Sequence, residues 1–123
     1  MVQKIKIVLA IAFVILVLLA ACSKNDPAKD EFAKCLADKG AIFYGAFWCP
    51  HCAEQKKLFG SSMEHINYIE CSTPDKQGQT RICQEKDIQG YPTWEFTDGS
   101  RQSGVLSLQD LGQATGCSLT VPE

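Results

Sequence analysis

The stretch Ile42-Phe-Tyr-Gly-Ala-Phe-Trp-Cys-Pro-His-Cys52 joins an apolar run to a Cys-x-x-Cys motif. The run 42–46 has the length and the continuous apolar character of a central strand that is buried on both faces. Pro50 suits the first turn of a helix, because its missing N–H would be unpaired there in any case. The sequence therefore predicts a buried strand followed by a helix, with Cys49 and Cys52 at the junction.

This junction favours thiol chemistry. A cysteine at the start of a helix meets unpaired backbone N–H groups and the positive end of the helix dipole, and both favour the thiolate. Cys52 follows Cys49 by three residues, so a helix brings the two within disulfide reach, and His51 adds a group that can carry positive charge. The alternatives are a structural disulfide and half of a zinc site, which lacks a second ligand pair at comparable spacing. Redox chemistry is the interpretation that the context favours.

The N-terminal residues resemble a secretion signal. Lys4 and Lys6 precede the uncharged apolar run 7–21, which is short beside the about 20 residues of a spanning helix but suits the core of a signal peptide. The run ends Leu19-Ala-Ala-Cys22, which resembles the bacterial lipoprotein signal, whose cysteine is acylated and becomes the new N-terminus. An uncleaved signal anchor is the alternative. Both place the rest of the chain outside the cytoplasm at a membrane, in the periplasm or on the outer face of the cytoplasmic membrane, where disulfides persist.

One domain is expected after this leader. The predicted parts are a signal peptide or anchor (1–21), a tether (22–28), a folded domain (29–118) and a tail (119–123). The chain has 12 basic and 14 acidic residues and a formal net charge of −2, with no basic patch that would suggest nucleic acid. We expect a monomer that is held at the membrane by a lipid anchor.

Helix and strand signals alternate along the domain. Asp26 and Pro27 predict a helix start, Asp98-Gly99 a hairpin turn, and Ser107 with Asp110 a capping box that opens the last helix. The expected helices and strands are, in chain order, helix 27–39, strand 42–46, helix 49–59, strand 66–69, helix 79–88, strands 93–97 and 103–106, and helix 107–115.

This order, with Cys-x-x-Cys at the first strand-to-helix turn, resembles the thioredoxin fold, an α/β fold with a central four-stranded mixed sheet flanked by helices. The segment Gly90-Tyr-Pro-Thr93 strengthens the resemblance, because thioredoxin-like proteins have a cis-proline before the third strand, facing the active-site pair. The resemblance implies a cis bond at Pro92 and contacts of an extended substrate with Tyr91 and Pro92. Trp48 is expected at the rim as a further substrate contact.

Longer segments resemble the thioredoxin-like domain that is fused to, or partners, bacterial and plastid vitamin K epoxide reductase homologues. The resemblance covers about residues 30–117. It rests on Phe32-Ala-Lys-Cys-Leu36, Phe43-Tyr-Gly-Ala-Phe-Trp-Cys-Pro-His-Cys52, Gln55-Lys-Lys-Leu-Phe-Gly60, Glu70-Cys-Ser-Thr-Pro-Asp75 and Tyr91-Pro-Thr-Trp94. It implies a thiol oxidoreductase that oxidises secreted proteins and is reoxidised by a membrane-embedded reductase that passes electrons to a quinone. The single apolar segment cannot supply that multi-helix reductase, so a separate partner protein is expected.

One position departs from ordinary thioredoxins. Those proteins have a buried carboxylate six residues before the first active-site cysteine, and it takes the proton of the second cysteine. Here that position is Phe43. Glu54 and Glu70 are candidates for the base by their proximity in sequence, although we expect both to be surface carboxylates. The sequence leaves open which group deprotonates Cys52.

Four cysteines remain besides Cys22 and the active-site pair, and they allow three pairings. Cys71 ends a predicted strand and Cys83 lies in the next helix, and the family resemblance also implies this pair. Cys35 and Cys117 lie on the first and last helices, which could pack side by side. Free buried thiols are the alternative. His65 is expected to be a plain surface residue.

The leading function is an enzyme whose Cys49 attacks a disulfide, or is attacked within one, while Cys52 resolves the mixed disulfide with a client protein. Pro50 and His51 favour an oxidant, because stabilising the reduced form raises the reduction potential. No cofactor other than the redox-active Cys49–Cys52 disulfide, and no metal, is expected. The alternatives are a reductant of the cytochrome c maturation type and a copper-handling module in which Cys49, Cys52 and His51 hold copper(I).

Overall fold

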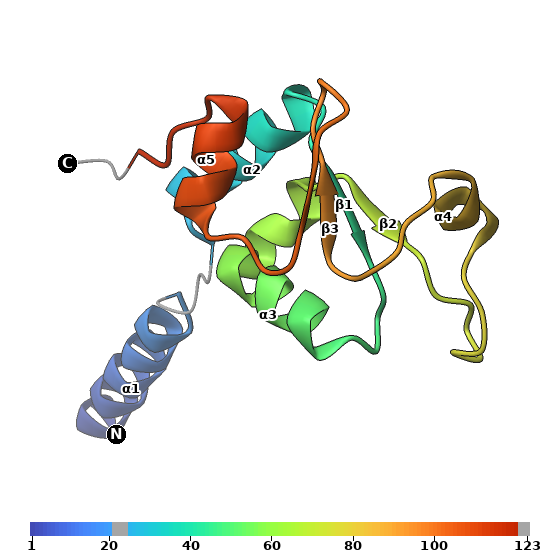
Figure 1. Cartoon of the computed structure of the whole chain (residues 1–123). Helices are drawn as coiled ribbons and strands as arrows, with labels where there is room; N and C mark the ends of the chain where they lie inside the picture. Colours follow the sequence, from blue (N-terminus) through green and yellow to red (C-terminus); the bar gives the residue numbers. More distant parts are fainter. Residues whose placement is uncertain (21–24, 121–123) are drawn as a thin grey trace.

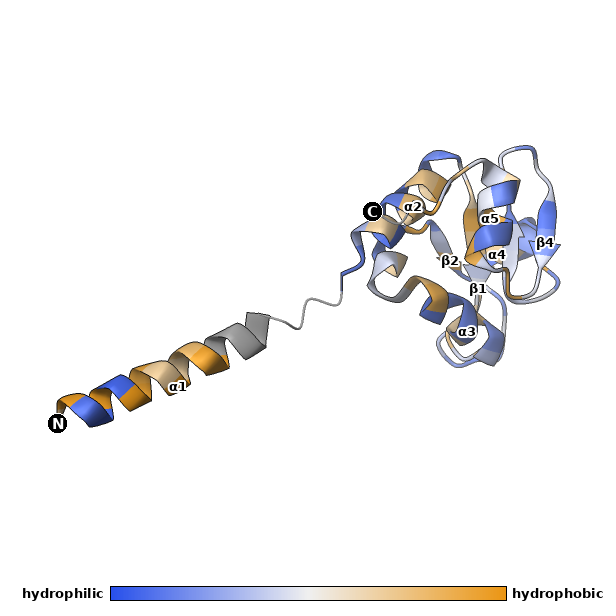
Figure 2. Ribbon diagram, turned by 90° about the vertical axis from the view of Figure 1, so that its left-hand side faces the viewer, coloured by the Kyte–Doolittle hydropathy of each residue, from blue (hydrophilic) through white to orange (hydrophobic). Residues whose placement is uncertain are grey.

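The computed structural model describes the backbone of residues 1–20 and the whole of residues 25–120. Cys22, the expected lipidation residue, lies outside the described residues. Helix α1 (Val2–Ala20) is largely hydrophobic where its residues are coloured in Figure 2. Within the described part of the chain, no helix combines the length and the apolar character that a membrane span needs.

The centre of the domain is a mixed four-stranded sheet (Figure 1). Its strands lie in the order β2 (Tyr68–Glu70), β1 (Ile42–Gly45), β3 (Thr93–Glu95) and β4 (Arg101–Ser103). Strand β1 runs parallel to β2 and antiparallel to β3, which runs antiparallel to β4. This confirms the expected α/β architecture, a central mixed sheet flanked by helices.

Four helices of the domain follow the expected order. They are α2 (Pro27–Asp38), α3 (Pro50–Phe59), α4 (Arg81–Glu85) and α5 (Leu108–Thr115). The Asp26 carboxylate accepts hydrogen bonds from the N–H groups of Ala28 and Lys29 and so caps α2. The capping box of α5 is confirmed, because the Ser107 hydroxyl accepts a hydrogen bond from the Asp110 N–H and donates one to its carboxylate.

Two expected boundaries were wrong after the active-site helix. A 3₁₀-helix, η1 (Gly60–His65), was not expected, and it delays the start of β2 to Tyr68. Helix α4 is shorter than the expected 79–88. The Gln79 side chain donates hydrogen bonds to the Ile88 carbonyl and the Tyr91 hydroxyl, so Gln79 links the ends of this segment and stays outside the helix.

The second strand of the hairpin was also placed wrongly, because β4 covers Arg101–Ser103 and not 103–106. The Asp98 carboxylate accepts hydrogen bonds from the backbone N–H and the hydroxyl of Ser100, which tightens the turn and starts β4 early. Gly104 has a φ of 96° and its N–H donates to the Pro92 carbonyl, which ends the strand.

The sheet has two differently covered faces, visible on either side of the strands in Figure 1. Helices α2, α3 and α5 cover one face, and α4 lies on the other. The first face carries a large core that includes Phe32, Phe43, Phe59, Trp94 and Leu111. The second carries a small core of Tyr44, Cys71, Cys83 and Ile88.

Two disulfides join elements of the domain. Cys35 of α2 is bonded to Cys117, which follows α5, with a Cα–Cα distance of 6.0 Å. Cys71, which follows β2, is bonded to Cys83 of α4, with a Cα–Cα distance of 5.5 Å. The four cysteines outside the Cys-x-x-Cys motif and the leader are thus joined in the pairs expected from the sequence.

Candidate active site

Cys49 and Cys52 meet at the junction of β1 and α3. Cys49 is the N-cap of α3 and Pro50 is its first residue. Both cysteines are free thiols. The Cys49 residue is 7% exposed and Cys52 is fully buried, so Cys49 is the thiol that another molecule reaches first.

The two thiols differ in their electrostatic surroundings. Burial raises the pKa of Cys52 to about 12, and a hydrogen bond from the Ala46 backbone offsets only part of this effect. The Cys49 thiol lies 3.7 Å from the Tyr91 carbonyl, to which it donates. Cys49 also sits at the helix terminus, where negative charge is favoured. The arrangement suits a nucleophile at Cys49, the less buried of the two thiols, and a protected resolving thiol at Cys52.

The segment before β3 forms the other wall of the site. The Tyr91–Pro92 peptide bond is cis, as the resemblance implied. The Tyr91 carbonyl faces the Cys49 sulfur, and the Tyr91 hydroxyl accepts a hydrogen bond from Gln79. The structure thus brings the Tyr91–Pro92 segment and the cysteine pair together, as the resemblance implied.

An apolar rim lies beside Cys49. Trp48 and Phe47 are 45% and 50% exposed. The Trp48 indole donates a hydrogen bond of 2.7 Å to the Ser72 hydroxyl, and its ring contacts the Tyr91 ring edge-on. Large aromatic side chains that are half exposed next to a reactive thiol are suited to contact an unfolded or extended client.

His51 is a surface residue of α3. Its side chain is 72% exposed, and Nδ1 lies 3.6 Å from the Glu54 carboxylate one helical turn later. The described contacts therefore link His51 to Glu54, and this pairing offsets the positive charge that His51 can offer to Cys49. Glu54 is an exposed carboxylate, as expected.

Glu70 is not the surface carboxylate that we expected. It is half-buried, and its two oxygens accept hydrogen bonds from the Tyr68 hydroxyl and from the N–H groups of Phe47 and Ser72. Phe43, at the position of the usual buried carboxylate, packs against the rings of Tyr68 and Trp94. The sequence analysis missed Tyr68. A tyrosine in a predicted strand reveals neither its hydrogen bond to Glu70 nor its closeness to Cys52.

Gln55 was also missed, although its spacing contains a signal. It follows Cys52 by three residues and so lies on the same buried face of α3. Its side chain is fully buried, accepts hydrogen bonds from the Trp94 indole and the Leu106 N–H, and donates one to the Leu106 carbonyl. A polar residue on the buried face of a helix is satisfied in this way, and Gln55 ties the active-site helix to β3 and to the segment before α5.

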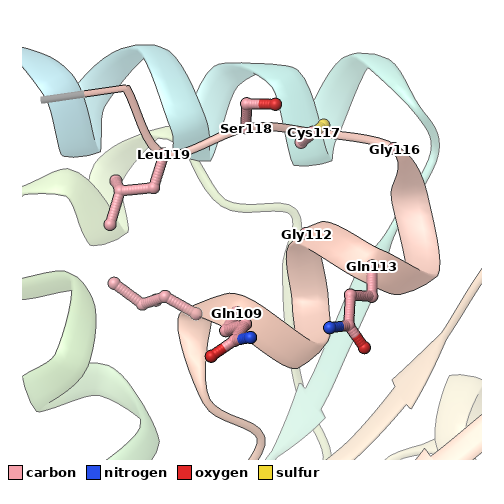
Figure 3. A pocket seen from close by; sticks show the side chains of 8 residues that line it. Gln109, Gly112, Gln113, Gly116, Cys117, Ser118 and Leu119 are labelled. Atoms are coloured by element: carbon pink, nitrogen blue, oxygen red, sulfur yellow. The ribbon is translucent and has the colours of Figure 1, made fainter.

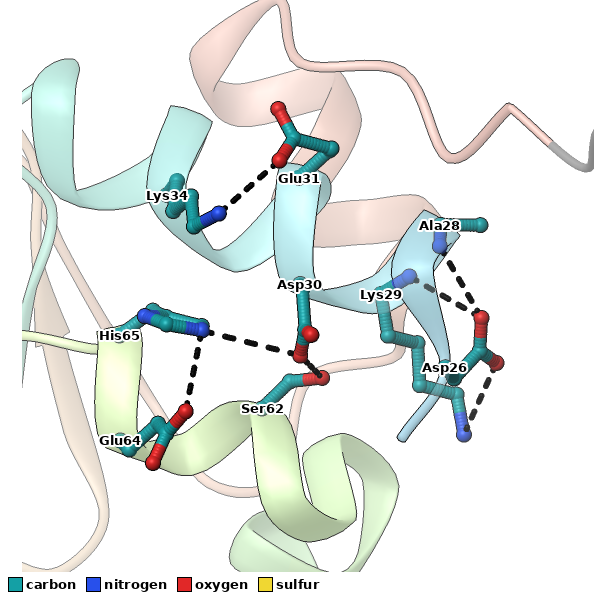
Figure 4. Close-up of polar contacts among 9 residues, drawn as sticks. All are labelled: Asp26, Ala28, Lys29, Asp30, Glu31, Lys34, Ser62, Glu64 and His65. Atoms are coloured by element: carbon teal, nitrogen blue, oxygen red, sulfur yellow. Dashed lines mark hydrogen bonds and ion pairs between the residues drawn. The ribbon is translucent and has the colours of Figure 1, made fainter. Parts of the chain in front are cut away.

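His65 belongs to a structural cluster away from the cysteine pair, and the expectation of a plain surface residue was wrong. Figure 4 shows the cluster between α2 and η1, where the Asp30 carboxylate accepts a hydrogen bond of 2.6 Å from the Ser62 hydroxyl and lies 3.8 Å from His65. His65 is also 3.3 Å from Glu64. These contacts hold η1 against α2.

A shallow pocket lies between α5 and the segment that follows it (Figure 3). Its lining carries neither a free thiol nor a titratable side chain and comprises Leu108, Gln109, Gly112, Gln113, Gly116, Cys117, Ser118 and Leu119. Among the residues that the structure describes, there is no cluster of three or more His, Cys, Asp or Glu side chains that could hold a metal ion. Cys49 and Cys52 are the free thiols among the residues that the structure describes.

Comparison with known proteins also points to thiol–disulfide chemistry at Cys49 and Cys52. No family model matches the chain. The thiol-disulfide oxidoreductase LTO1 of Arabidopsis thaliana is 41% identical over 101 residues, covering 79% of this chain and 27% of that protein, so the chain corresponds to about a quarter of this relative. The protein disulfide isomerase-like protein 5-1 of Oryza sativa subsp. japonica is 28% identical over 122 residues, covering 89% of this chain and 83% of that protein.

Among solved structures, oxidised thioredoxin O2 of Arabidopsis thaliana is similar with a TM-score of 0.37 and 15% identity, covering 69% of this chain and 84% of that one. Two sequence relatives are named for thiol–disulfide chemistry. The sheet order and the free cysteine pair at the start of α3 agree with such chemistry. The chain is therefore similar over most of its length to a region of a thiol-disulfide oxidoreductase.

Proposed function

We propose that this protein is an extracytoplasmic, membrane-tethered oxidant of protein thiols, reoxidised by a membrane-embedded quinone reductase of the vitamin K epoxide reductase type. The observation that carries the proposal is the free pair at the start of α3, in which Cys49 is slightly exposed and Cys52 is fully buried. The redox unit is the pair itself, with no further cofactor.

The reaction begins when a client thiolate attacks the sulfur of Cys49 in the Cys49–Cys52 disulfide. A mixed disulfide forms between the client and Cys49, and Cys52 is released as the leaving group. A second client thiolate then attacks the client sulfur of the mixed disulfide and releases Cys49. The client gains a disulfide, and the protein keeps two electrons as a dithiol that its partner must remove.

The direction of electron flow follows from the relative stability of the dithiol. The N-terminus of α3 favours negative charge at Cys49. This effect supports the reduced form, and each 30 mV of higher potential corresponds to about 1.4 kcal/mol. A potential of about −120 to −200 mV is therefore expected, above the value of about −270 mV for thioredoxin.

Membrane tethering rests on Lys4, Lys6, the apolar run 7–21 and Cys22. A short tether would hold the domain near a quinone-linked partner and raise the effective concentration of each for the other. The two structural disulfides suit an oxidising compartment outside the cytoplasm. Mass spectrometry of membrane-extracted protein should find an acylated N-terminus at Cys22, whereas an intact Met1 terminus would favour a signal anchor.

The deciding measurement is the reduction potential of the Cys49–Cys52 pair in a glutathione redox buffer. Cys49→Ser should abolish exchange. Cys52→Ser should accumulate mixed disulfides when its Cys49 thiolate attacks a disulfide of a client or of the partner, because Cys52 is then missing as the resolving thiol. A potential at or below that of thioredoxin, together with no exchange with a reconstituted quinone reductase, would favour the reductant of the cytochrome c maturation type.

A further inference from the structure

Cys52 must lose its thiol proton before it can attack a mixed disulfide at Cys49, because the thiolate is the nucleophile. Burial raises the pKa of Cys52 to about 12, so few molecules carry this thiolate at neutral pH. Resolution therefore requires a group that accepts the proton during the attack. Phe43, on the adjacent strand, supplies an apolar ring and no acceptor.

The Tyr68 ring and the Cys52 sulfur both lie beside Gly45. A Cβ atom at Gly45 would lie 2.9 Å from Cε2 of Tyr68 and 3.2 Å from Sγ of Cys52. Glycine leaves this space open, so the tyrosine ring and the sulfur both approach the Gly45 backbone. Tyr68 pairs with Phe43 across the sheet and lies on the face that α3 covers.

The Tyr68 hydroxyl has an acceptor of its own. It donates a hydrogen bond of 2.6 Å to Oε2 of Glu70. Oε1 of Glu70 accepts hydrogen bonds of 3.0 Å from the N–H groups of Phe47 and Ser72. These three bonds fix the carboxylate between β2 and the loop that carries Cys49, so its orientation is set before a client arrives.

The titratable and charged groups that face this spot are Tyr68 and Glu70 from β2 and Cys49 and Lys56 from the N-cap and body of α3. Lys56 follows Cys52 by about one helical turn, and its ammonium lies 4.0 Å from the centroid of the Tyr68 ring. Its positive charge lowers the pKa of Cys52 slightly, against the larger effect of burial. Burial and the Glu70 carboxylate raise the pKa of Tyr68, so Tyr68 remains a hydroxyl donor to Glu70.

We propose that Tyr68 and Glu70 form a proton relay for Cys52. As Cys52 attacks Cys49, its proton passes to the phenol oxygen of Tyr68 while the Tyr68 proton passes to Glu70. The Cys49–Cys52 bond forms, the bond between Cys49 and the client sulfur breaks, and the client leaves as a thiolate with the electron pair. When a client thiolate opens the Cys49–Cys52 disulfide, the relay runs in reverse and returns a proton to Cys52.

The relay rests on thiol–disulfide exchange at Cys49 and Cys52, but it serves either direction of electron flow. Its test is therefore separate from the test of the oxidant role. A reductant with this geometry would use the relay in the same way, and a measured potential says nothing about the relay.

The test follows the reaction of the reduced protein with the aromatic disulfide 5,5′-dithiobis(2-nitrobenzoate). Attack by Cys49 releases one coloured thiolate, and resolution by Cys52 releases a second one. In Tyr68→Phe, which keeps the ring, the first phase should be unchanged and the second should slow by about 10²-fold at pH 7. The second phase should then recover as the pH rises, because hydroxide replaces the relay. Glu70→Gln should behave in the same way.

Matched controls come from the other face of the sheet. Tyr44→Phe removes a buried tyrosine hydroxyl, and Glu95→Gln removes a carboxylate of β3. Both variants should keep the two phases and their pH profiles. Wild-type second phases in Tyr68→Phe and Glu70→Gln would overturn the relay. So would slowing of both phases in parallel with an unchanged pH profile, because that result indicates a structural role. If Glu70→Gln does not fold, Tyr68→Phe decides alone, and absence of the first phase in the wild type would overturn the exchange activity itself.

Discussion

The two faces of the sheet are stabilised by different means. On the face under α2, α3 and α5, five buried aromatic residues pack in one cluster, with Phe43 stacked on Trp94 at a centroid distance of 5.1 Å. On the other face, α4 covers only a small cluster and is bonded to the end of β2 by Cys71–Cys83. One face relies on buried apolar area, and the other relies on a covalent link.

The difference separates two tasks at the active site. The large face holds Cys52, Tyr68 and Gln55, so the buried resolving thiol sits in the larger of the two cores. The small face anchors the loop that carries Ser72, which holds the indole of Trp48 at the rim. Damage to the large face should therefore unfold the domain, and damage to the small face should mainly loosen the surface that clients meet.

The largest effect is expected from Trp94→Ala on the large face. The substitution removes a fully buried ring and leaves the Gln55 amide oxygen without its indole donor. The free energy of unfolding should fall by about 3–5 kcal/mol. Denaturant unfolding of the oxidised protein measures this, with Trp48→Ala on the exposed rim as the matched control. A loss below about 1 kcal/mol would show that the large face is not the main source of stability.

The second prediction removes the link on the small face. Replacing Cys71 and Cys83 together by alanine opens a loop of sequence separation 12. The free energy of unfolding should fall by about 2–4 kcal/mol. Exchange with small thiols should persist, while oxidation of protein clients slows because Ser72 no longer holds Trp48 firmly. Equal slowing with small thiols would show that the disulfide also supports the catalytic pair.

The third prediction concerns pH and depends on the burial of Cys52. In the unfolded chain this thiol titrates near its ordinary pKa, whereas in the folded protein its pKa is raised to about 12. At neutral pH both states are protonated, and as the pH rises from about 9 towards 12 only the unfolded state loses the proton. The reduced protein should therefore lose stability over this range, as thermal unfolding would show.

Two forms of the protein serve as references for this pH effect. The oxidised protein and reduced Cys52→Ala both lack the Cys52 thiol, so they should lose less stability over the same range. Identical pH curves for all three forms would mean that the Cys52 thiol is not buried in solution.

The smallest effect is expected from Tyr44→Phe on the small face. The Tyr44 hydroxyl is buried, and among the described residues no group offers it a hydrogen bond of acceptable geometry. Removing it therefore costs no bond, and stability should change by less than about 1 kcal/mol. A larger loss, measured by denaturant unfolding, would reveal a partner for this hydroxyl on the small face.

Local chemistry in the sequence was enough to predict most elements. Asp26 and Ser107 start their helices because a side-chain oxygen satisfies free N–H groups a few residues later, which is a short-range effect. The apolar run before Cys49 predicted β1, because a short continuous apolar run is typical of a strand buried on both faces. The Cys-x-x-Cys spacing predicted the reactive pair. The boundaries that were wrong, at η1, α4 and β4, depend on side-chain hydrogen bonds to distant or turn residues, which no periodicity reveals.

By itself, the sequence determined the order of elements, the place of the cysteine pair and the likeness to thioredoxin-like proteins, since each depends on residues that are neighbours in the chain. Only the tertiary structure decided that Glu70 is held half-buried with Tyr68 next to Cys52. Pairing of β1 with β2 and packing of α3 on the sheet bring residues 45, 52 and 68 close together. Which group accepts the proton of a buried thiol depends on burial and on distances between residues that are far apart in the chain. Local sequence determines neither.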